Sequence, residues 1–75
     1  MMISNIKLKK YSVTLWGHRT SVTLENIFWQ ELKKIALQKK VSIAKLIQEI
    51  DDERGNNLSS AIRVFVLMWH LREEE

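Results

Sequence analysis

A period-two alternation between residues 11 and 24 limits how this chain can fold more than any other feature of its sequence. The residues of the apolar parity are, on the two sides of Gly17, Tyr11, Val13, Leu15, Thr20, Val22 and Leu24. Such an alternation, rich in β-branched residues, is typical of a half-buried β-strand. Gly17 marks the place of a turn, a bulge or a kink, so the segment is predicted to form a short hairpin or one bent ribbon.

A strand region of this length cannot make a stable sheet alone. The chain has 75 residues, and at about this size folding buries only about 60% of the surface of an unfolded chain. The sequence has no cysteine and two histidines, which excludes disulfides and leaves too few ligands for a tetrahedral zinc site within one chain. A partner subunit is the remaining stabilising device. We therefore expect a homodimer in which each strand pairs antiparallel with its mate.

Two helices are predicted directly after the strand region. Glu25 and Asn26 stand where helix starts favour an acidic or capping side chain, and the helical apolar spacing then extends over residues 27–40. Ser42 is predicted to cap a second helix, which ends at the left-handed residue Gly55.

A third helix is predicted from a cap at Asn57 or Ser59 to about Leu71. It is apolar nearly all round, and a helix without a polar face must be buried. A single chain of this size has too little protein to surround it, which again indicates a partner chain.

Positive charge is concentrated in the first half of the chain. The formal net charge is +3, and residues 1–24 alone contribute +4 because they contain four cations and no acid. Residues 25–40 add +2, whereas residues 41–75 contribute −3. A one-sided basic region is typical of a protein with a polyanionic partner such as nucleic acid.

Residues 19–50 resemble the ribbon-helix-helix family of DNA-binding proteins. The segments that match are the strand Arg19–Leu24, the helix Glu25–Lys40 and the second helix Ser42–Ile50. A wider set is similar to a bacterial branch of the family that has an extra third helix; it consists of Ser12–Leu15, Gly17–Val22, Phe28, Trp29 and Asn57–Ala61.

The resemblance implies a mainly α fold with one N-terminal β-strand region, built as an intertwined homodimer. The two strands of the dimer would form an antiparallel ribbon that enters the major groove of double-stranded DNA. The expected function is that of a sequence-specific bacterial transcriptional regulator, acting as a repressor.

The resemblance also assigns roles to individual residues. The expected base-contacting residues are Arg19, Ser21 and Thr23, and an arginine can make a bidentate contact to guanine. The expected phosphate-contacting residues are Ser42, Ile43, Lys9, Lys10, Lys39, Lys40, Lys45 and His18; helix N-termini bind anions, and lysines add affinity without sequence information. The expected dimer core consists of Val22, Leu24, Leu32, Ile35, Leu46, Ile47, Ile62 and Phe65.

No enzyme activity, cofactor or metal site is predicted, because no set of residues suited to catalysis is present. The longest uncharged stretch, Val64–Leu71, is far shorter than the ~20 residues of a membrane span. The lack of cysteine fits a reducing compartment, so we expect a cytoplasmic, nucleoid-associated protein.

Other interpretations stay open at this point. The chain could be the antitoxin of a toxin–antitoxin pair, although its short segment after Leu71 counts against this, or a non-DNA interaction module that binds a protein partner through the third helix. Residues 1–75 are expected to form one domain, with residues 1–10 as a basic arm. Three alternatives remain for Lys7–Trp16, namely an arm, an added strand or a cover for the third helix.

Overall fold

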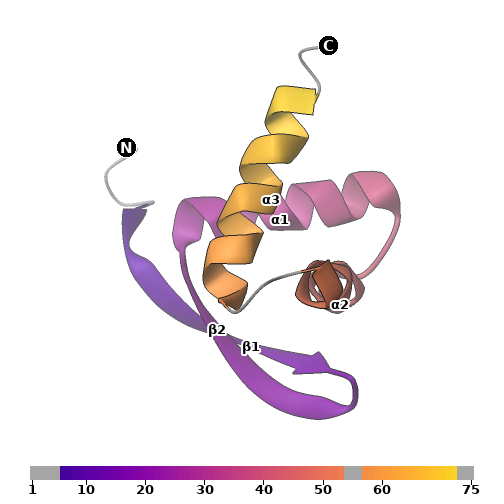
Figure 1. Cartoon of the computed structure of the whole chain (residues 1–75). Coiled ribbons are helices and arrows are strands. Elements are labelled where there is room, and N and C mark those ends of the chain that lie inside the picture. Colours follow the sequence, from indigo (N-terminus) through magenta and orange to yellow (C-terminus); the bar gives the residue numbers. More distant parts are fainter. Residues whose placement is uncertain (1–5, 54–56, 73–75) are drawn as a thin grey trace.

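The computed structural model describes residues 6–53 and 57–72. In chain order the elements are β1 (Leu8–Leu15), β2 (His18–Glu25), α1 (Asn26–Lys39), α2 (Ile43–Glu53) and α3 (Leu58–Arg72). The two strands form an antiparallel sheet, and α3 leads away from it toward the C-terminus (Figure 1). The predicted strand region and three helices are thus confirmed, whereas the predicted helix end at Gly55 lies outside the described residues.

The strand region is a tight hairpin rather than one bent ribbon. Leu15 pairs with His18, so the loop consists of Trp16 and Gly17 alone. Both loop residues have positive φ, 56° and 82°, as a type I′ turn requires. Glycine adopts this conformation without a steric cost, but a bulky residue such as tryptophan rarely does.

The segment that precedes the predicted ribbon is an added strand. Lys9 and Lys10, which were expected to belong to a basic arm, lie in β1. The second strand of the ribbon therefore comes from the same chain, and the hairpin forms without a mate.

Contacts at both ends fix β1 to the helices. The Tyr11 ring stacks on Trp29 of α1 with a centroid distance of 4.1 Å, and its hydroxyl donates to Asn26 Oδ1 at 3.0 Å. At the other end, the backbone N–H of Trp16 donates to Gln48 Oε1 of α2 at 3.2 Å. The first strand of the hairpin is therefore held by α1, and the turn of the hairpin is held by α2.

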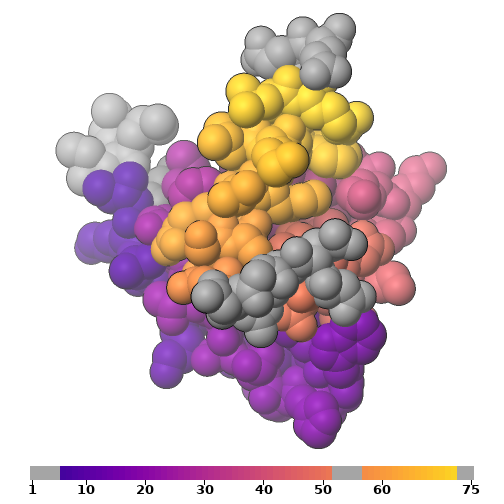
Figure 2. Space-filling view, in the orientation of Figure 1, coloured from indigo at the N-terminus to yellow at the C-terminus, as the bar shows by residue number. Residues whose placement is uncertain are grey.

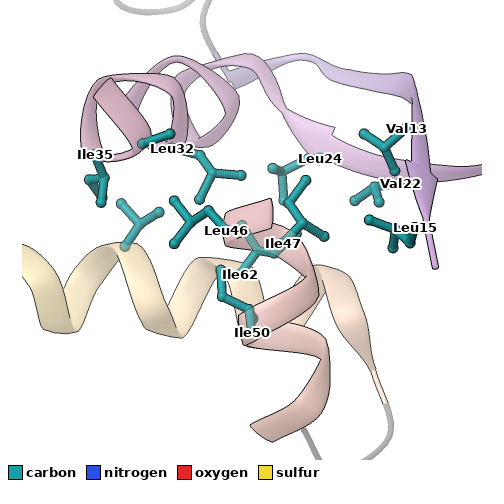
Figure 3. Close-up of a cluster of buried hydrophobic side chains, with 12 residues drawn as sticks. Val13, Leu15, Val22, Leu24, Leu32, Ile35, Leu46, Ile47, Ile50 and Ile62 are labelled. Atoms are coloured by element: carbon teal, nitrogen blue, oxygen red, sulfur yellow. The ribbon is translucent and has the colours of Figure 1, made fainter. Parts of the chain in front are cut away.

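One face of the hairpin packs on the helices, as the alternation predicts. Val13 and Leu15 of β1 and Val22 and Leu24 of β2 are buried, and their side chains point toward the helices (Figure 3). Thr20 shares their parity but is exposed near the turn.

The core is continuous and lies within one chain. Its helical members are Leu32, Ile35, Ala36, Leu46, Ile47, Ile50, Ile62 and Val66. Seven of the eight residues expected in a dimer core are among the buried residues, while Phe65 is only partly buried. They form the core of a single chain, and their part in a dimer stays a prediction.

One side of α3 is left uncovered by the described residues of the chain. Ile62 and Val66 are buried against the core. The opposite side has four large apolar side chains that are 52% to 62% exposed: Val64, Leu67, Met68 and Leu71. The expected burial of the third helix is therefore met on one side only.

Local capping residues set the helix boundaries. The Ser42 hydroxyl accepts a hydrogen bond from the Lys45 N–H at 3.0 Å, and Asn57 Oδ1 accepts one from the Ser60 N–H at 3.0 Å. Lys40 ends α1 in the left-handed conformation with φ of 61°. The predicted cap at Ser42 is confirmed, and Asn57 rather than Ser59 caps α3.

Candidate nucleic-acid interface

The hairpin face that points away from the helices is polar throughout. We call it the outward face; its six residues are all exposed and form three cross-strand pairs, Lys10 with Thr23, Ser12 with Ser21, and Thr14 with Arg19. It therefore combines two cations with four hydroxyl groups. These groups can form hydrogen bonds with base edges and phosphates.

The three predicted base-contacting residues lie together on this face. Arg19, Ser21 and Thr23 are alternate residues of β2 and are all exposed. Sequence reasoning missed their neighbours Ser12 and Thr14 on β1. The pairing could have been found from the two-residue loop, because a loop at residues 16–17 fixes the register of both strands.

The backbone groups of β2 alternate between its two edges, because residues of an antiparallel pair bond to the partner strand at every second position. Beyond the end of β2, the Asn26 N–H donates to the Lys7 carbonyl at 3.0 Å and so extends the ladder with the β1 side. Even-numbered residues of β2 therefore direct their backbone groups to β1.

Odd-numbered residues of β2 direct their backbone groups to the other edge. The Thr23 carbonyl accepts a hydrogen bond from the Ser59 hydroxyl of α3 at 2.7 Å, which confirms this direction. The N–H and C=O of Arg19 and Ser21 also point to this edge, where no strand pairs with them in the described part of the chain. This free edge of β2 is able to accept another strand.

The two lysines of β1 lie on opposite faces of the hairpin. Lys10 pairs with Thr23 on the outward face, whereas Lys9 pairs with Leu24 and has the parity of the helix-packed face. His18 pairs with Leu15 beside the turn and shares the parity of Leu24. Of these three predicted phosphate contacts, only Lys10 belongs to the outward face.

The middle of α2 contacts the turn of the hairpin. Ser42 and Lys45 are at the N-terminal end of the helix, and Ile43 is its first residue. Gln48, which binds the Trp16 N–H, is five residues after Ile43, or about 7 Å along the helix axis. The structure thus brings the predicted phosphate-binding helix terminus within two turns of the hairpin tip.

The two lysines at the end of α1 are more distant from the hairpin. Lys39 Nζ lies 5.7 Å from the centroid of the Trp69 ring, close to the end of α3. Ser59, which contacts β2, is ten residues earlier on the same helix, a rise of about 15 Å. The structure therefore does not bring Lys39 to the outward face, and Lys40, the next residue, serves as the C-cap of α1.

The one carboxylate in the hairpin strands is neutralised. Glu25 sits at the N-cap position of α1 without capping it, and its two oxygens accept hydrogen bonds from Arg63 Nε at 2.8 Å and Nη2 at 3.2 Å. The hydrogen bonds from Arg63 are the main cause that lowers the pKa of Glu25 from its ordinary value. No uncompensated negative charge therefore adjoins the outward face within the strands.

Metal-binding and membrane-spanning features are absent from residues 6–53 and 57–72. These residues contain no cluster of three or more histidine or acidic side chains that could hold a metal ion. None of the helices described there is long and apolar enough to cross a membrane.

Similarity to known proteins agrees with this geometry. No curated protein matches the chain. The solved structure of an uncharacterized protein from Bordetella pertussis Tohama I is similar, with a TM-score of 0.82 and 28% sequence identity over 96% of this chain. The chain spans 62% of the length of that protein. The family model of the ribbon-helix-helix domain matches residues 8–70, from the start of β1 into the last turn of α3, and this chain therefore belongs to that family.

Proposed function

We propose that this protein is a sequence-specific duplex-DNA-binding protein that contacts DNA through the outward face of its hairpin. One observation carries the proposal: six exposed side chains, two cationic and four hydroxylic, line one side of a two-stranded ribbon whose other side is fixed to a core. A two-stranded ribbon is one of the two elements that the major groove admits. Members of the ribbon-helix-helix family are commonly DNA-binding regulators.

The side chains of β2 suit base recognition. Arg19 can donate two hydrogen bonds to O6 and N7 of a guanine, a geometry that its planar guanidinium favours. Ser21 and Thr23 can donate or accept, and the methyl group of Thr23 can contact a thymine methyl. Discrimination would therefore depend mainly on Arg19.

We further propose that two copies pair through the free edge of β2. The unpaired backbone groups of Arg19 and Ser21 support this arrangement, because they can continue the sheet into a second chain. Four strands at a spacing of about 4.8 Å place the two outer strands about 14 Å apart, which exceeds the groove width of about 12 Å. The two β2 strands would then occupy the groove, and the β1 strands would lie over its walls.

In this arrangement the base contacts and the phosphate contacts come from different elements. Lys10 on β1 would reach phosphates at the groove walls, and the N-terminus of α2 at Ser42 would offer backbone N–H groups to another phosphate. Bound DNA would be occluded from other proteins, which is the simplest mechanism for a bacterial repressor in the cytoplasm. The fold of the family is non-enzymatic, in keeping with a role that depends on binding alone.

A salt titration tests the proposal. Affinity for mixed-sequence duplex DNA would be measured by fluorescence anisotropy over a range of salt concentrations, with the mass of the protein in solution determined alongside. We expect a dimer whose log affinity falls linearly with log salt concentration. Arg19→Lys should then cost ~1–3 kcal/mol at one base pair and relax the preference there. A folded protein that ignores DNA at low salt would contradict the proposal.

The exposed side of α3 favours a second function, that of a protein-interaction module. An antitoxin would be one form of it, and a small protein that copurifies with the chain would be its sign. Such a module predicts no salt-sensitive DNA binding, so the same titration separates the two functions.

A further inference from the structure

The exposed apolar residues of α3 lie on one face of the helix. We call Val64, Leu67, Met68 and Leu71 the α3 stripe; they follow the spacing i, i+3, i+4 and i+7, which is typical of a helix that packs on another helix. Each keeps more than half of its surface in contact with solvent. Figure 2 shows α3, in orange to yellow, at the surface of the molecule.

A groove beside the stripe extends this surface toward α2. It has a volume of about 670 Å³ and is lined by Leu46, Glu49, Ile50, Ala61, Val64, Phe65 and Met68. Val64 and Met68 belong to both the stripe and the groove, so the two form one continuous apolar surface. Glu49 is the one charged residue in the lining.

Two opposite charges beside this surface have no ion-pair partner within residues 6–53 and 57–72. Glu49 is exposed on α2 and makes no ion pair in the described part of the chain. At the C-terminal end of α3, the Arg72 guanidinium stacks on the Trp69 ring at 4.1 Å from its centroid and contacts no described carboxylate.

The other two basic side chains of α3 each contact a carboxylate. Arg63 binds Glu25, and His70 Nε2 lies 2.8 Å from Glu31 Oε1 of α1. These pairs join α3 to β2 and α1. Of the basic side chains described on α3, Arg72 alone therefore has no carboxylate partner among the described residues.

We propose that the α3 stripe and the groove bind α3 of a second copy of this chain, with the two helices antiparallel. The stripe carries no charge, so it can pack against itself without repulsion. When Val64 lies opposite Met68 of the other copy, Leu71 lies opposite Ala61 at the groove. Arg72 then reaches the Glu49 end of the other α2, and symmetry forms this ion pair twice. A parallel arrangement would bring the two Arg72 side chains together instead.

The area that a stable dimer buries indicates that both the α3 stripe and the groove belong to the interface. A specific interface buries about 800 Å² per partner, more than four partly exposed side chains of one helix can supply. The groove adds the missing apolar surface because it is open beside the stripe. A second α3 is also long enough, at 15 residues or about 22 Å, to cover both.

This interface is separate from the β2 edge that the proposed function uses. Its two-fold axis would pass between the two α3 helices, whereas the other would pass between the two β2 strands. A chain with both interfaces forms assemblies larger than a dimer. Mass is measured without DNA, so a failure of this inference is distinguishable from a failure of DNA binding.

Sedimentation velocity over a range of protein concentrations tests the interface with two substitutions. Leu67→Glu places a charge in the middle of the stripe, and Ser21→Pro removes an N–H from the free edge of β2, where proline is tolerated. We expect the wild type to exceed a dimer, each single variant to form a dimer, and the double variant to be a monomer. Leu37→Glu is the matched control, because Leu37 is 79% exposed on α1 and lies outside the stripe.

A charge exchange tests the antiparallel arrangement. Arg72→Glu and Glu49→Arg should each weaken the association of Ser21→Pro chains about tenfold, since two ion pairs are lost together. The variant with both changes should regain the original affinity. The inference is overturned if Leu67→Glu sediments like Leu37→Glu at every concentration. The antiparallel arrangement is overturned if the exchange does not restore affinity.

Discussion

Two adjacent lysines of β1 allow a sharp test of which hairpin face binds DNA. Lys10 belongs to the outward face, opposite Thr23, whereas Lys9 lies opposite the fully buried Leu24 on the helix side. Lys10→Gln and Lys9→Gln remove the same charge from neighbouring positions on one strand. Any difference between them therefore reports the face and not the net charge.

The size of the effect follows from counterion release. Each phosphate contact contributes about 0.9 to the slope of log affinity against log salt concentration, so a dimer without Lys10 should lose about 1.8. At a salt concentration of about 0.15 M, this loss corresponds to roughly 30-fold weaker binding. Lys9→Gln should leave the slope nearly unchanged.

Fluorescence anisotropy with one labelled duplex measures both variants across a series of salt concentrations. Circular dichroism first establishes that each variant is folded. Equal losses of slope for the two variants, or no loss for Lys10→Gln, would refute the assignment of the outward face to DNA.

Three further predictions concern stability. Glu25→Gln should destabilise the fold by about 0.2–1 kcal/mol at neutral pH, the range of exposed ion pairs. Because Arg63 lowers the pKa of Glu25 in the folded state, urea unfolding should show this difference shrink as the pH falls below the ordinary value of 4.5 and vanish below the folded-state pKa. Gly17→Ala should cost about 1 kcal/mol of unfolding free energy and lower Tm by about 4–8 °C, because φ of Gly17 is +82° although nothing lies within 4 Å of an added Cβ. Gly17→Asn should cost less, since asparagine tolerates positive φ. Equal losses for the two variants would indicate crowding instead of backbone strain. Ile47→Ala, at a position with 0% exposure, should lower the unfolding free energy by about 2–5 kcal/mol in a urea titration, and a loss below that range would mean that the core closes around the gap.

Local features of this fold were predictable from the sequence. The parity of Val22 and Leu24 against Arg19 and Ser21 identifies the two faces of β2, since side chains alternate along a strand whatever its partner. The cap at Ser42 was also predictable, because its hydrogen bond to the Lys45 N–H joins residues only three positions apart.

Contacts between distant residues were not predictable in this way. The sequence left the partner of β2 undecided between a hairpin and a bent ribbon, because Trp16 is an unusual residue for a type I′ turn, which favours asparagine, aspartate or glycine at that position. The position of Lys39 at the far end of α3 depends on how the helices cross, and one-dimensional spacing carries no information about that. The DNA-contacting roles themselves stay predictions that the titrations above address.

Because β1 supplies β2 with a partner, the hairpin of one chain is complete without a second copy. The paired residues are close in sequence, from Leu15 with His18 to Leu8 with Glu25, and contacts of this kind form rapidly. Each chain can thus complete its core in a first-order process that does not depend on protein concentration. A second copy would then bind a chain that is already folded, so dimers could assemble on DNA from folded monomers, one half-site at a time.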